Sequence, residues 1–274
     1  MVNQNQPKTD KWDAGATYEP YVGRWSRLVA REFLNWLNVP AGARWLDVGC
    51  GTGALSQTIL NHADPLEVKG IDPSDAFVTF AREHVVDERV SFELGDAQQL
   101  PLESSHYDAV VAGLALNFIP DKPKALGEMV RVAKPASVIA AYVWDYADQM
   151  QMMRIFWDAV VALHPAAIEL DEGPRFPICG PEPLSELFQS MGLEQVEARS
   201  IDVPTHFRDF DDYWTPFLGG VGPAPAYVMS LNEQERTELR DMIQAHLPTG
   251  PDGSIHLIAR AWAVRGVRPM ANAH

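Results

Sequence analysis

Three aspartates in the first half of the chain are spaced so that their carboxylates could meet in one binding site. Asp47 lies next to the end of an apolar segment, and Asp72 and Asp96 stand just after two later segments of the same kind. If these segments are parallel strands, their carboxyl ends share one edge of a sheet, where α/β proteins bind ligands. We therefore expect the three carboxylates to face one crevice.

A glycine-rich loop begins directly after the first of these segments, with glycines at positions 49, 51 and 53. Alternating glycines allow a sharp turn and leave no side chain between the backbone N–H groups and a ligand. The helix that follows directs its positive N-terminus to the same place. Such a loop can hold a polar, partly anionic cofactor.

The three carboxylates match the polar groups of one cofactor. Asp72 stands about 20 residues beyond the glycines, where an acid can accept both hydrogen bonds of a ribose diol. Asp47 could accept from an ammonium group, directly or through water, and Asp96 from the exocyclic amine of adenine. A ligand with ammonium, ribose and adenine groups in a row is S-adenosylmethionine, which we predict as the cofactor.

An alternation of predicted strands and helices would position these residues. From Arg24 onward, apolar residues at helical spacing form a face that should cover a sheet. Strands separated by helices form right-handed crossovers, and therefore a parallel sheet with helices on both faces. Further predicted helices begin at Ala54, Ser74 and Asp121, and the predicted strands cover residues 43–48, 67–71, 90–94, 107–112 and 137–144.

The second half of the chain adds two insertions and two more strands. Residues 173–183 are rich in Pro and Gly and are expected to be irregular. In the second insertion, Ser230 and Glu233 have the spacing of a capping box that would open a helix. The remaining predicted strands cover residues 193–207 and 255–264.

The motifs of residues 40–146 resemble those of class I S-adenosylmethionine-dependent methyltransferases, in particular the small-molecule branch that includes the ubiquinone-biosynthesis type of C-methyltransferase. The resemblance implies transfer of a methyl group (EC 2.1.1.-) to an O, N, C or S atom of a small molecule by in-line displacement. It also implies that the glycine loop approaches the methionine moiety. The motifs that carry it are Leu46–Gly53, Gly70–Ser74, Gly95–Ala97 with Leu100–Pro101, Tyr107–Val111 and Met129–Pro135.

The expected fold is therefore α/β, a doubly wound, seven-stranded, mostly parallel sheet of the Rossmann-like methyltransferase type. By resemblance, the last strand is antiparallel. We expect a single methyltransferase domain over residues 1–274, with a helical lid formed by the insertions. Its parts would be an N-terminal cap 1–39, a cofactor-binding core 40–146, lid insertions 147–183 and 208–253, and final strands 193–207 and 254–265.

Candidate contacts follow from the motifs and from this organisation. An N-terminal segment that includes Tyr18 and Tyr21 matches one that folds over the cofactor in similar enzymes, Trp144 ends the fifth strand beside the crevice, and the second insertion is where such enzymes place substrate-facing residues. The expected cofactor contacts are Tyr21, Trp25, Asp47, Gly49, Gly51, Asp72, Pro73, Asp96, Ala97 and Leu114, and the expected substrate contacts are Tyr18, Trp144, Tyr213 and Trp214.

A general base is harder to find in the sequence. Similar enzymes often carry a His-rich pair after the fourth strand, but here the segment reads Leu114–Phe118 without histidine. His206, at the end of a long strand, is the candidate base that remains. A dedicated base is optional, because alignment supplies much of the rate enhancement in a displacement. The histidines show no metal-ligand spacing, so we expect no metal.

Two other functions fit parts of this pattern. The glycine loop also satisfies a dinucleotide fingerprint, as in a nicotinamide-dependent oxidoreductase. The acid before the first glycine and the third acid, Asp96, favour methyl transfer instead. A non-catalytic S-adenosylmethionine-binding sensor or scaffold would keep the same acids. The predicted aromatic lid argues against it.

Composition limits the partners of the chain. Its 274 residues carry 22 Lys and Arg against 37 Asp and Glu, a formal net charge of −15. This charge would repel nucleic acid and anionic lipid headgroups. Two cysteines give no disulfide framework and no apolar segment is long enough to span a bilayer. We expect a cytoplasmic protein with a small-molecule partner.

Overall fold

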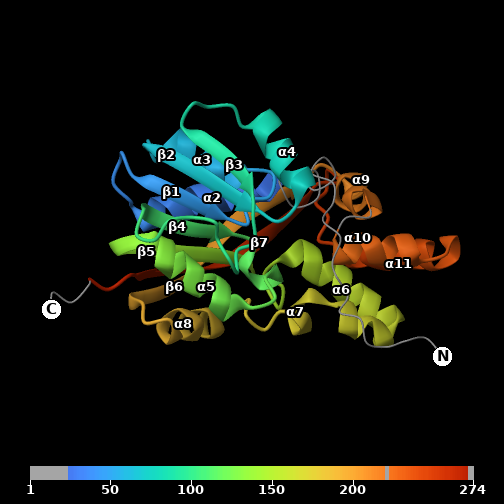
Figure 1. Cartoon of the computed structure of the whole chain (residues 1–274). Coiled ribbons are helices and arrows are strands. Elements are labelled where there is room, and N and C mark those ends of the chain that lie inside the picture. Colours follow the sequence, from blue (N-terminus) through green and yellow to red (C-terminus); the bar gives the residue numbers. More distant parts are fainter. Residues whose placement is uncertain (1–23, 220–221, 271–274) are drawn as a thin grey trace.

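A seven-stranded sheet lies at the centre of the computed structural model, which describes residues 24–219 and 222–270 (Figure 1). The strand order is β3-β2-β1-β4-β5-β7-β6, and β7 alone among these strands runs antiparallel to its neighbours. The expected fold class is confirmed. The strands are β1 (Arg44–Val48), β2 (Glu67–Asp72), β3 (Val90–Leu94), β4 (Tyr107–Gly113), β5 (Ala133–Trp144), β6 (Glu194–Phe207) and β7 (Ile255–Val267).

Helices cover both faces of this sheet. Figure 1 shows α2 and α3 behind the sheet and α5 and α8 in front of it. The strand order reverses between β1 and β4, and such a switch point leaves a crevice outside the carboxyl ends of the strands. The covering helices are α2 (Arg24–Leu37), α3 (Ala54–His62), α4 (Asp75–His84), α5 (Lys122–Val132) and α8 (Pro181–Ser190).

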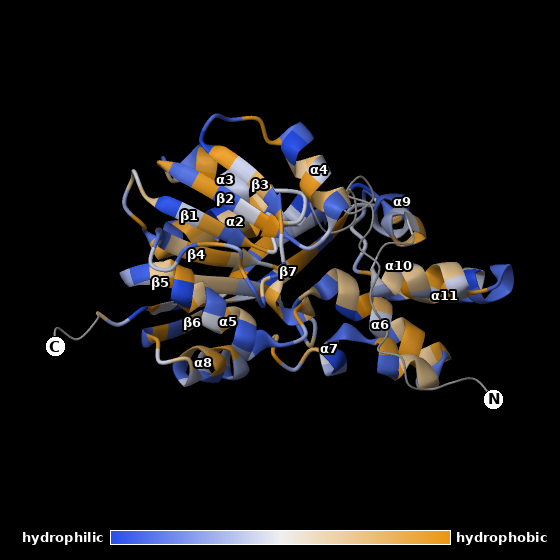
Figure 2. Ribbon diagram, viewed as in Figure 1, coloured by the Kyte–Doolittle hydropathy of each residue, from blue (hydrophilic) through white to orange (hydrophobic). Residues whose placement is uncertain are grey.

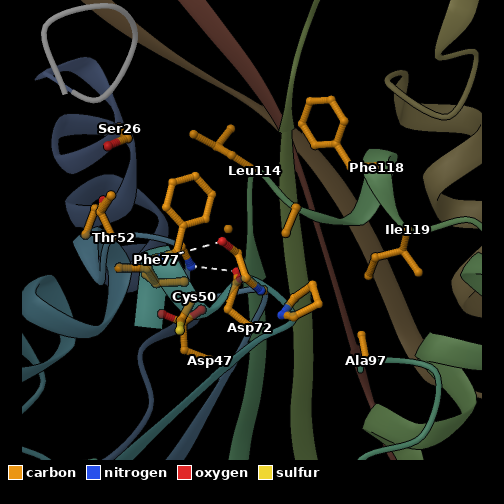
Figure 3. Close-up of a pocket in the computed structure, with 18 of the residues that line it drawn as sticks. Ser26, Asp47, Cys50, Thr52, Asp72, Phe77, Ala97, Leu114, Phe118 and Ile119 are labelled. Atoms are coloured by element: carbon orange, nitrogen blue, oxygen red, sulfur yellow. Dashed lines mark hydrogen bonds between the residues drawn. The ribbon is translucent and has the colours of Figure 1, made fainter. Parts of the chain in front are cut away.

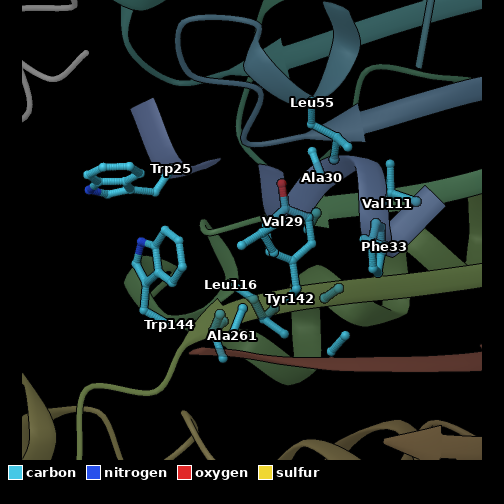
Figure 4. Packing of buried hydrophobic residues seen from close by; sticks show 14 of the residues in the cluster. Trp25, Val29, Ala30, Phe33, Leu55, Val111, Leu116, Tyr142, Trp144 and Ala261 are labelled. Carbon is cyan, nitrogen blue, oxygen red and sulfur yellow. The ribbon is translucent and has the colours of Figure 1, made fainter. Parts of the chain in front are cut away.

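The central strands are buried because both faces are covered. In β1 every residue from Trp45 to Val48 is buried, as expected for a parallel strand between two helical layers. Helix α2 places its apolar side on the sheet, where the ring centroid of Phe33 lies 4.7 Å from that of Tyr142 on β5. Figure 4 shows this cluster between α2 and the strands. It fixes α2 beside the carboxyl ends of β4 and β5.

A second group of helices lies at one end of the sheet, on the right in Figure 1. Figure 2 shows hydrophobic residues along the strands and on α6, and more polar residues on α11. Phe156 of α6 stacks on Phe217 with ring centroids 4.6 Å apart, and Arg154 forms an ion pair with buried Asp171. We call this group the end helices: α6 (Gln151–Leu163), α7 (Glu172–Arg175), α9 (Phe210–Trp214), α10 (Pro223–Ser230) and α11 (Glu233–His246), with the short turns Pro165–Leu170 and Thr215–Gly219.

The structure corrects two local expectations. The capping box of α11 consists of Asn232 and Glu235, whereas Ser230 lies in the last turn of α10 and donates to the carbonyl of Tyr227. The stretch 173–183 is also not wholly irregular, because α8 begins at Pro181. Proline suits the first turn of a helix, where its missing N–H costs nothing. Turn-forming residue types alone did not distinguish a helix start from a loop.

Within the described part of the chain, none of the helices combines the length and the apolar character that crossing a bilayer requires.

We expect Asn232→Ala to lower the free energy of unfolding by about 1 kcal/mol, because the substitution leaves backbone N–H groups of α11 without a cap. Ser230→Ala serves as the matched control and should change it by less than about 0.5 kcal/mol, as is usual for a surface position. Urea denaturation of both variants measures these differences. Equal costs would contradict the assignment of the cap.

Candidate functional site

A cavity of about 400 Å³ opens at the carboxyl ends of β1, β2, β4 and β5 (Figure 3). The glycine loop, the residues that follow β2 and β3, and the segment after β4 contribute to its lining. Expected site residues in the lining are Asp47, Gly49, Gly51, Asp72, Pro73, Asp96, Ala97, Leu114 and Trp144. The structure therefore brings together most of the expected cofactor residues that it describes.

The carboxylate of Asp72 holds the glycine loop in place. One of its oxygens accepts from the backbone N–H of Gly51 and the other from that of Ser74, each at 2.9 Å. The backbone N–H of Gly49 donates to the carbonyl of Ile71 at 2.7 Å. Burial raises the pKa of Asp72, although both N–H donors act in the opposite direction. Asp72 thus ties β2 to the loop after β1, in addition to facing the cavity.

The three loop glycines are needed for different reasons. A Cβ on Gly49 would lie 2.5 Å from the Cβ of Ala115, and one on Gly53 would lie 2.9 Å from Val85. A Cβ on Gly51 would meet no atom of the described residues within 4 Å, although its φ of +51° is unfavourable for other residues. Packing therefore leaves no room for a side chain at Gly49 or Gly53. At Gly51 the backbone stands next to open space in the cavity.

Asp47 is the most buried acid of the site. Its side chain is 1% exposed, one carboxylate oxygen accepts from the hydroxyl of Ser56 at 2.8 Å, and the other oxygen has no partner. Burial raises the pKa of Asp47 to about 7, the Ser56 hydroxyl opposes this, and the charge of Asp72 adds to it. An unpaired, buried carboxylate oxygen at a cavity is suited to accept from a cationic N–H donor.

The third acid lies in different surroundings. Asp96 is exposed, and one of its oxygens accepts from the backbone N–H of Gln98 at 2.8 Å. This bond and those from the side-chain amide of Gln98 lower the pKa of Asp96. The neighbouring Ala97 is buried. Asp96 is therefore ionised at neutral pH and stands at the outer edge of the cavity.

An apolar wall faces the polar side of the cavity. Figure 3 shows Leu114, Phe118 and Ile119 across from Thr52 and Ser26. Leu114 has a φ of +58°, and its N–H donates to the carbonyl of Tyr142 at 2.8 Å. The wall continues to Trp144 and Tyr146 at the end of β5.

Several expected site residues do not line this cavity. Trp25 packs edge-on against Phe207 with ring centroids 5.6 Å apart. Tyr213 is fully buried among the end helices and donates to the carbonyl of Met152 at 2.8 Å, and Trp214 stacks on Phe210. This differs from the expectation that Tyr213 and Trp214 face the substrate, because the apolar faces of the end helices pack on one another there. Tyr18 and Tyr21 lie outside the described residues.

The candidate base also lies elsewhere. His206 is exposed on the edge strand β6, and its ring centroid lies 4.6 Å from that of His256. It is not among the cavity residues. Sequence analysis missed Ser56, whose hydroxyl binds Asp47, and the apolar residues Phe118 and Ile119. The position of Ser56 in the helix after the glycine loop was the available signal. Among residues 24–219 and 222–270, no His, Cys, Asp and Glu side chains group as metal ligands would.

Asp108, unlike the three acids of the site, lies at the opposite end of the sheet, where it binds two protein groups. Its carboxylate accepts from the backbone N–H of Arg44 at 2.9 Å and from the Lys134 ammonium at 2.6 Å. Burial would raise its pKa, but these hydrogen bonds and charges outweigh burial and lower it. Asp108 and Asp47 are therefore strand-associated acids whose pKa values are shifted in opposite directions.

Comparisons with known proteins give one consistent result. Residues 46–141 match the family model for a methyltransferase domain. A demethylmenaquinone methyltransferase from Staphylococcus aureus is 29% identical over 188 residues, which are 64% of this chain and 76% of the relative. The residues matched by the family model include the glycine loop and the ends of β1, β2 and β4.

Two solved structures show how widely the fold is shared. Phosphoethanolamine N-methyltransferase 2 from Haemonchus contortus, in complex with S-adenosyl-L-methionine, aligns with a TM-score of 0.59 at 16% identity, over 93% of this chain and 57% of that chain. A protein of an antibiotic biosynthesis pathway from Anabaena variabilis aligns with a TM-score of 0.61 at 20% identity, over 86% of this chain and 96% of that chain. At such identities the likeness establishes the fold.

Asp47→Asn tests the buried charge. The pKa of Asp47 in the folded protein, about 7, lies above the ordinary value of an aspartate, so its buried charge destabilises the fold above pH 7. This destabilisation disappears as the pH falls and the carboxyl binds a proton. Asn keeps an acceptor for Ser56 and carries no charge. We expect the variant to be more stable than the wild type at pH 8, by up to about 4 kcal/mol at roughly 1.4 kcal/mol per pKa unit.

Urea denaturation at pH 8 and pH 5 measures this effect, and the gain should shrink at pH 5. Asp108→Asn is the control with the opposite sign, because its lowered pKa means that ionised Asp108 stabilises the fold at pH 8. A gain for Asp47→Asn that does not depend on pH would rule out a buried charge as its cause.

Proposed function

We propose that the cavity of this methyltransferase domain binds S-adenosylmethionine beside a small apolar molecule to which the methyl group is transferred. The observation that carries the proposal is the unpaired oxygen of Asp47 beside the open face of Gly51. Together they offer an acceptor for an ammonium group and room for a ligand against the backbone.

The fit of the cofactor can be argued group by group. Asp47 would accept from the ammonium group of the methionine moiety, and the loop around Gly49 and Gly51 would lie against it. Asp72 would accept from the ribose hydroxyls with the lone pairs that its two backbone N–H donors leave free. Asp96 with Ala97 would hold the adenine. Pro73 and Leu114 line the same cavity and would complete the contacts.

S-adenosylmethionine supplies an electrophilic methyl group on a sulfonium. The residues of the chain would contribute alignment, because an in-line displacement depends on how nucleophile, methyl group and sulfur are held. The apolar wall of Phe118, Ile119 and Trp144 would position the acceptor and exclude water. Among the described residues, none of the end helices contributes to the lining of the cavity, so we assign them no role as the expected lid.

The nature of the acceptor follows from the wall and from the relatives. A wall of aliphatic and aromatic side chains favours a flat, apolar molecule. The relative from Staphylococcus aureus is a demethylmenaquinone methyltransferase, so reduced demethylmenaquinone is the first acceptor to test. The described lining contains no His, Lys or Arg, and its carboxylates are assigned to the cofactor above, so we assign no general base there.

Gly51→Val is expected to abolish binding of S-adenosylhomocysteine while the protein remains folded, because the branched side chain would fill the open space beside the loop. Gly42→Val is the matched control: Gly42 also has a positive φ, of +77°, and open space around its Cβ, but it lies away from this cavity. Both variants should lose stability, and only Gly51→Val should lose ligand affinity. Calorimetry measures affinity and circular dichroism the fold. Normal affinity of Gly51→Val for S-adenosylhomocysteine would show that the ligand does not contact the loop at Gly51.

Methyl transfer itself is tested with S-adenosylmethionine labelled on the methyl group. We expect calorimetric binding of S-adenosylhomocysteine but not of NAD, and labelled product from reduced demethylmenaquinone or another apolar acceptor in a metabolite extract. Binding of NAD without S-adenosylhomocysteine would favour an oxidoreductase. Cofactor binding without any labelled product across the extract would favour a sensor or scaffold.

A further inference from the structure

Hydrogen-bond donors without partners gather where α2 meets the end of β5. The indole N–H groups of Trp25 and Trp144 are buried and unpaired, and so are Nε and Nη2 of Arg24. Figure 4 shows both indole rings at the same end of the apolar cluster, with their nitrogens on the side away from Phe33 and Val111. Since a buried donor without a partner costs free energy, such a concentration requires an explanation.

Position distinguishes Trp144 from other unpaired donors of the chain. Trp45 on β1 also has a buried N–H group without a hydrogen-bond partner among the described residues, but Trp45 does not line the cavity. Trp144 is 2% exposed and does line it, on the apolar wall where the methyl acceptor would lie. Of the unpaired donors named so far, Trp144 is therefore the one whose side chain borders the cavity.

Arg24 adds positive charge to the same region. Its guanidinium carbon lies 4.4 Å from the ring centroid of Trp25 and 4.7 Å from that of Phe207, so the group packs against both rings. One nitrogen, Nη1, bonds to Asp212 at 3.3 Å, which leaves the other two without partners. The stacking fixes these donors next to the indole of Trp25.

We propose that the cavity has, at Trp144, a subsite for an oxygen anion of the methyl acceptor, with Trp144 as the specificity-determining donor and Arg24, which lies outside the lining, as a nearby positive charge. The inference rests on the proposed function, because its ligand is the methyl acceptor. Every unpaired group in the cluster donates, so the complementary ligand atom is an acceptor. An anionic oxygen forms stronger hydrogen bonds with such donors than a neutral atom does.

The same chemistry fits the absence of a base from the described lining. An acceptor molecule that already carries an ionised oxygen, such as an acidic phenol or enol, needs no side chain to remove its proton before methyl transfer. An amine that binds as a cation would meet the indole N–H of Trp144, which is a donor and not an acceptor. The subsite therefore selects oxygen acids over ammonium compounds.

Two probes with one ring system and opposite charge test the subsite: 2-naphthoate and 2-naphthylmethylammonium, titrated by calorimetry into the full chain saturated with S-adenosylhomocysteine. We expect naphthoate to bind at least about tenfold more tightly. Trp144→Phe keeps the ring and removes the N–H, and should weaken naphthoate about tenfold, as expected for one hydrogen bond to a charged group. Trp45→Phe removes a buried, unpaired N–H outside the cavity and should not change naphthoate affinity.

Arg24→Met gives a second, independent arm, because it removes donors and charge while keeping an apolar stem. It should reduce the preference for naphthoate over the cation. S-adenosylhomocysteine affinity is measured for every variant and should stay unchanged, which separates the subsite from the proposed function. Equal effects of Trp144→Phe and Trp45→Phe on naphthoate, or tighter binding of the cation by the wild type, would overturn the subsite. Loss of S-adenosylhomocysteine binding by the wild type would overturn the proposed function instead.

Discussion

The site depends on one carboxylate that joins two strand ends. Asp72 accepts from the backbone N–H of Gly51 and from that of Ser74, so one side chain sets the distance between the glycine loop and the start of α4. Ser74 is in turn the cap of α4, and its hydroxyl accepts from the N–H of Phe77. The cavity floor is therefore a set of backbone groups held by a single anion, and the position of every ligand contact follows from it.

Holding two carboxylates so close together has an energetic cost. Asp47 and Asp72 are both buried, and each charge makes the other harder to maintain. The free protein tolerates this because Asp72 is compensated by N–H donors and Asp47 can take up a proton near neutral pH. A ligand that brings a positive charge would relieve the remaining strain. The arrangement of the two acids in the free protein therefore favours binding of a positively charged group.

The sequence was sufficient for the half of the site that lies on strand ends. A glycine loop after an apolar strand and an acid after the next strand have few alternative geometries, so Asp47, Gly51 and Asp72 could be placed in one crevice. The helical half was less predictable. Tyr213 and Trp214 are aromatic and lie in an insertion, but residue type does not say whether a helix packs its apolar face inward or towards a ligand. The capping box was misplaced by two residues because Ser230 and Asn232 have similar cap preferences.

Gly49 and Gly51 show why motif and role are separate questions. Both belong to one motif, both have positive φ and both line the cavity. Gly49 is fixed by Ala115, which would collide with any Cβ, whereas no atom of residues 24–219 and 222–270 would collide with a Cβ on Gly51. A residue that the fold itself requires says little about a ligand. A glycine whose absent side chain leaves open space instead shows where a ligand can approach the backbone, and here that space lies between the acids and the apolar wall.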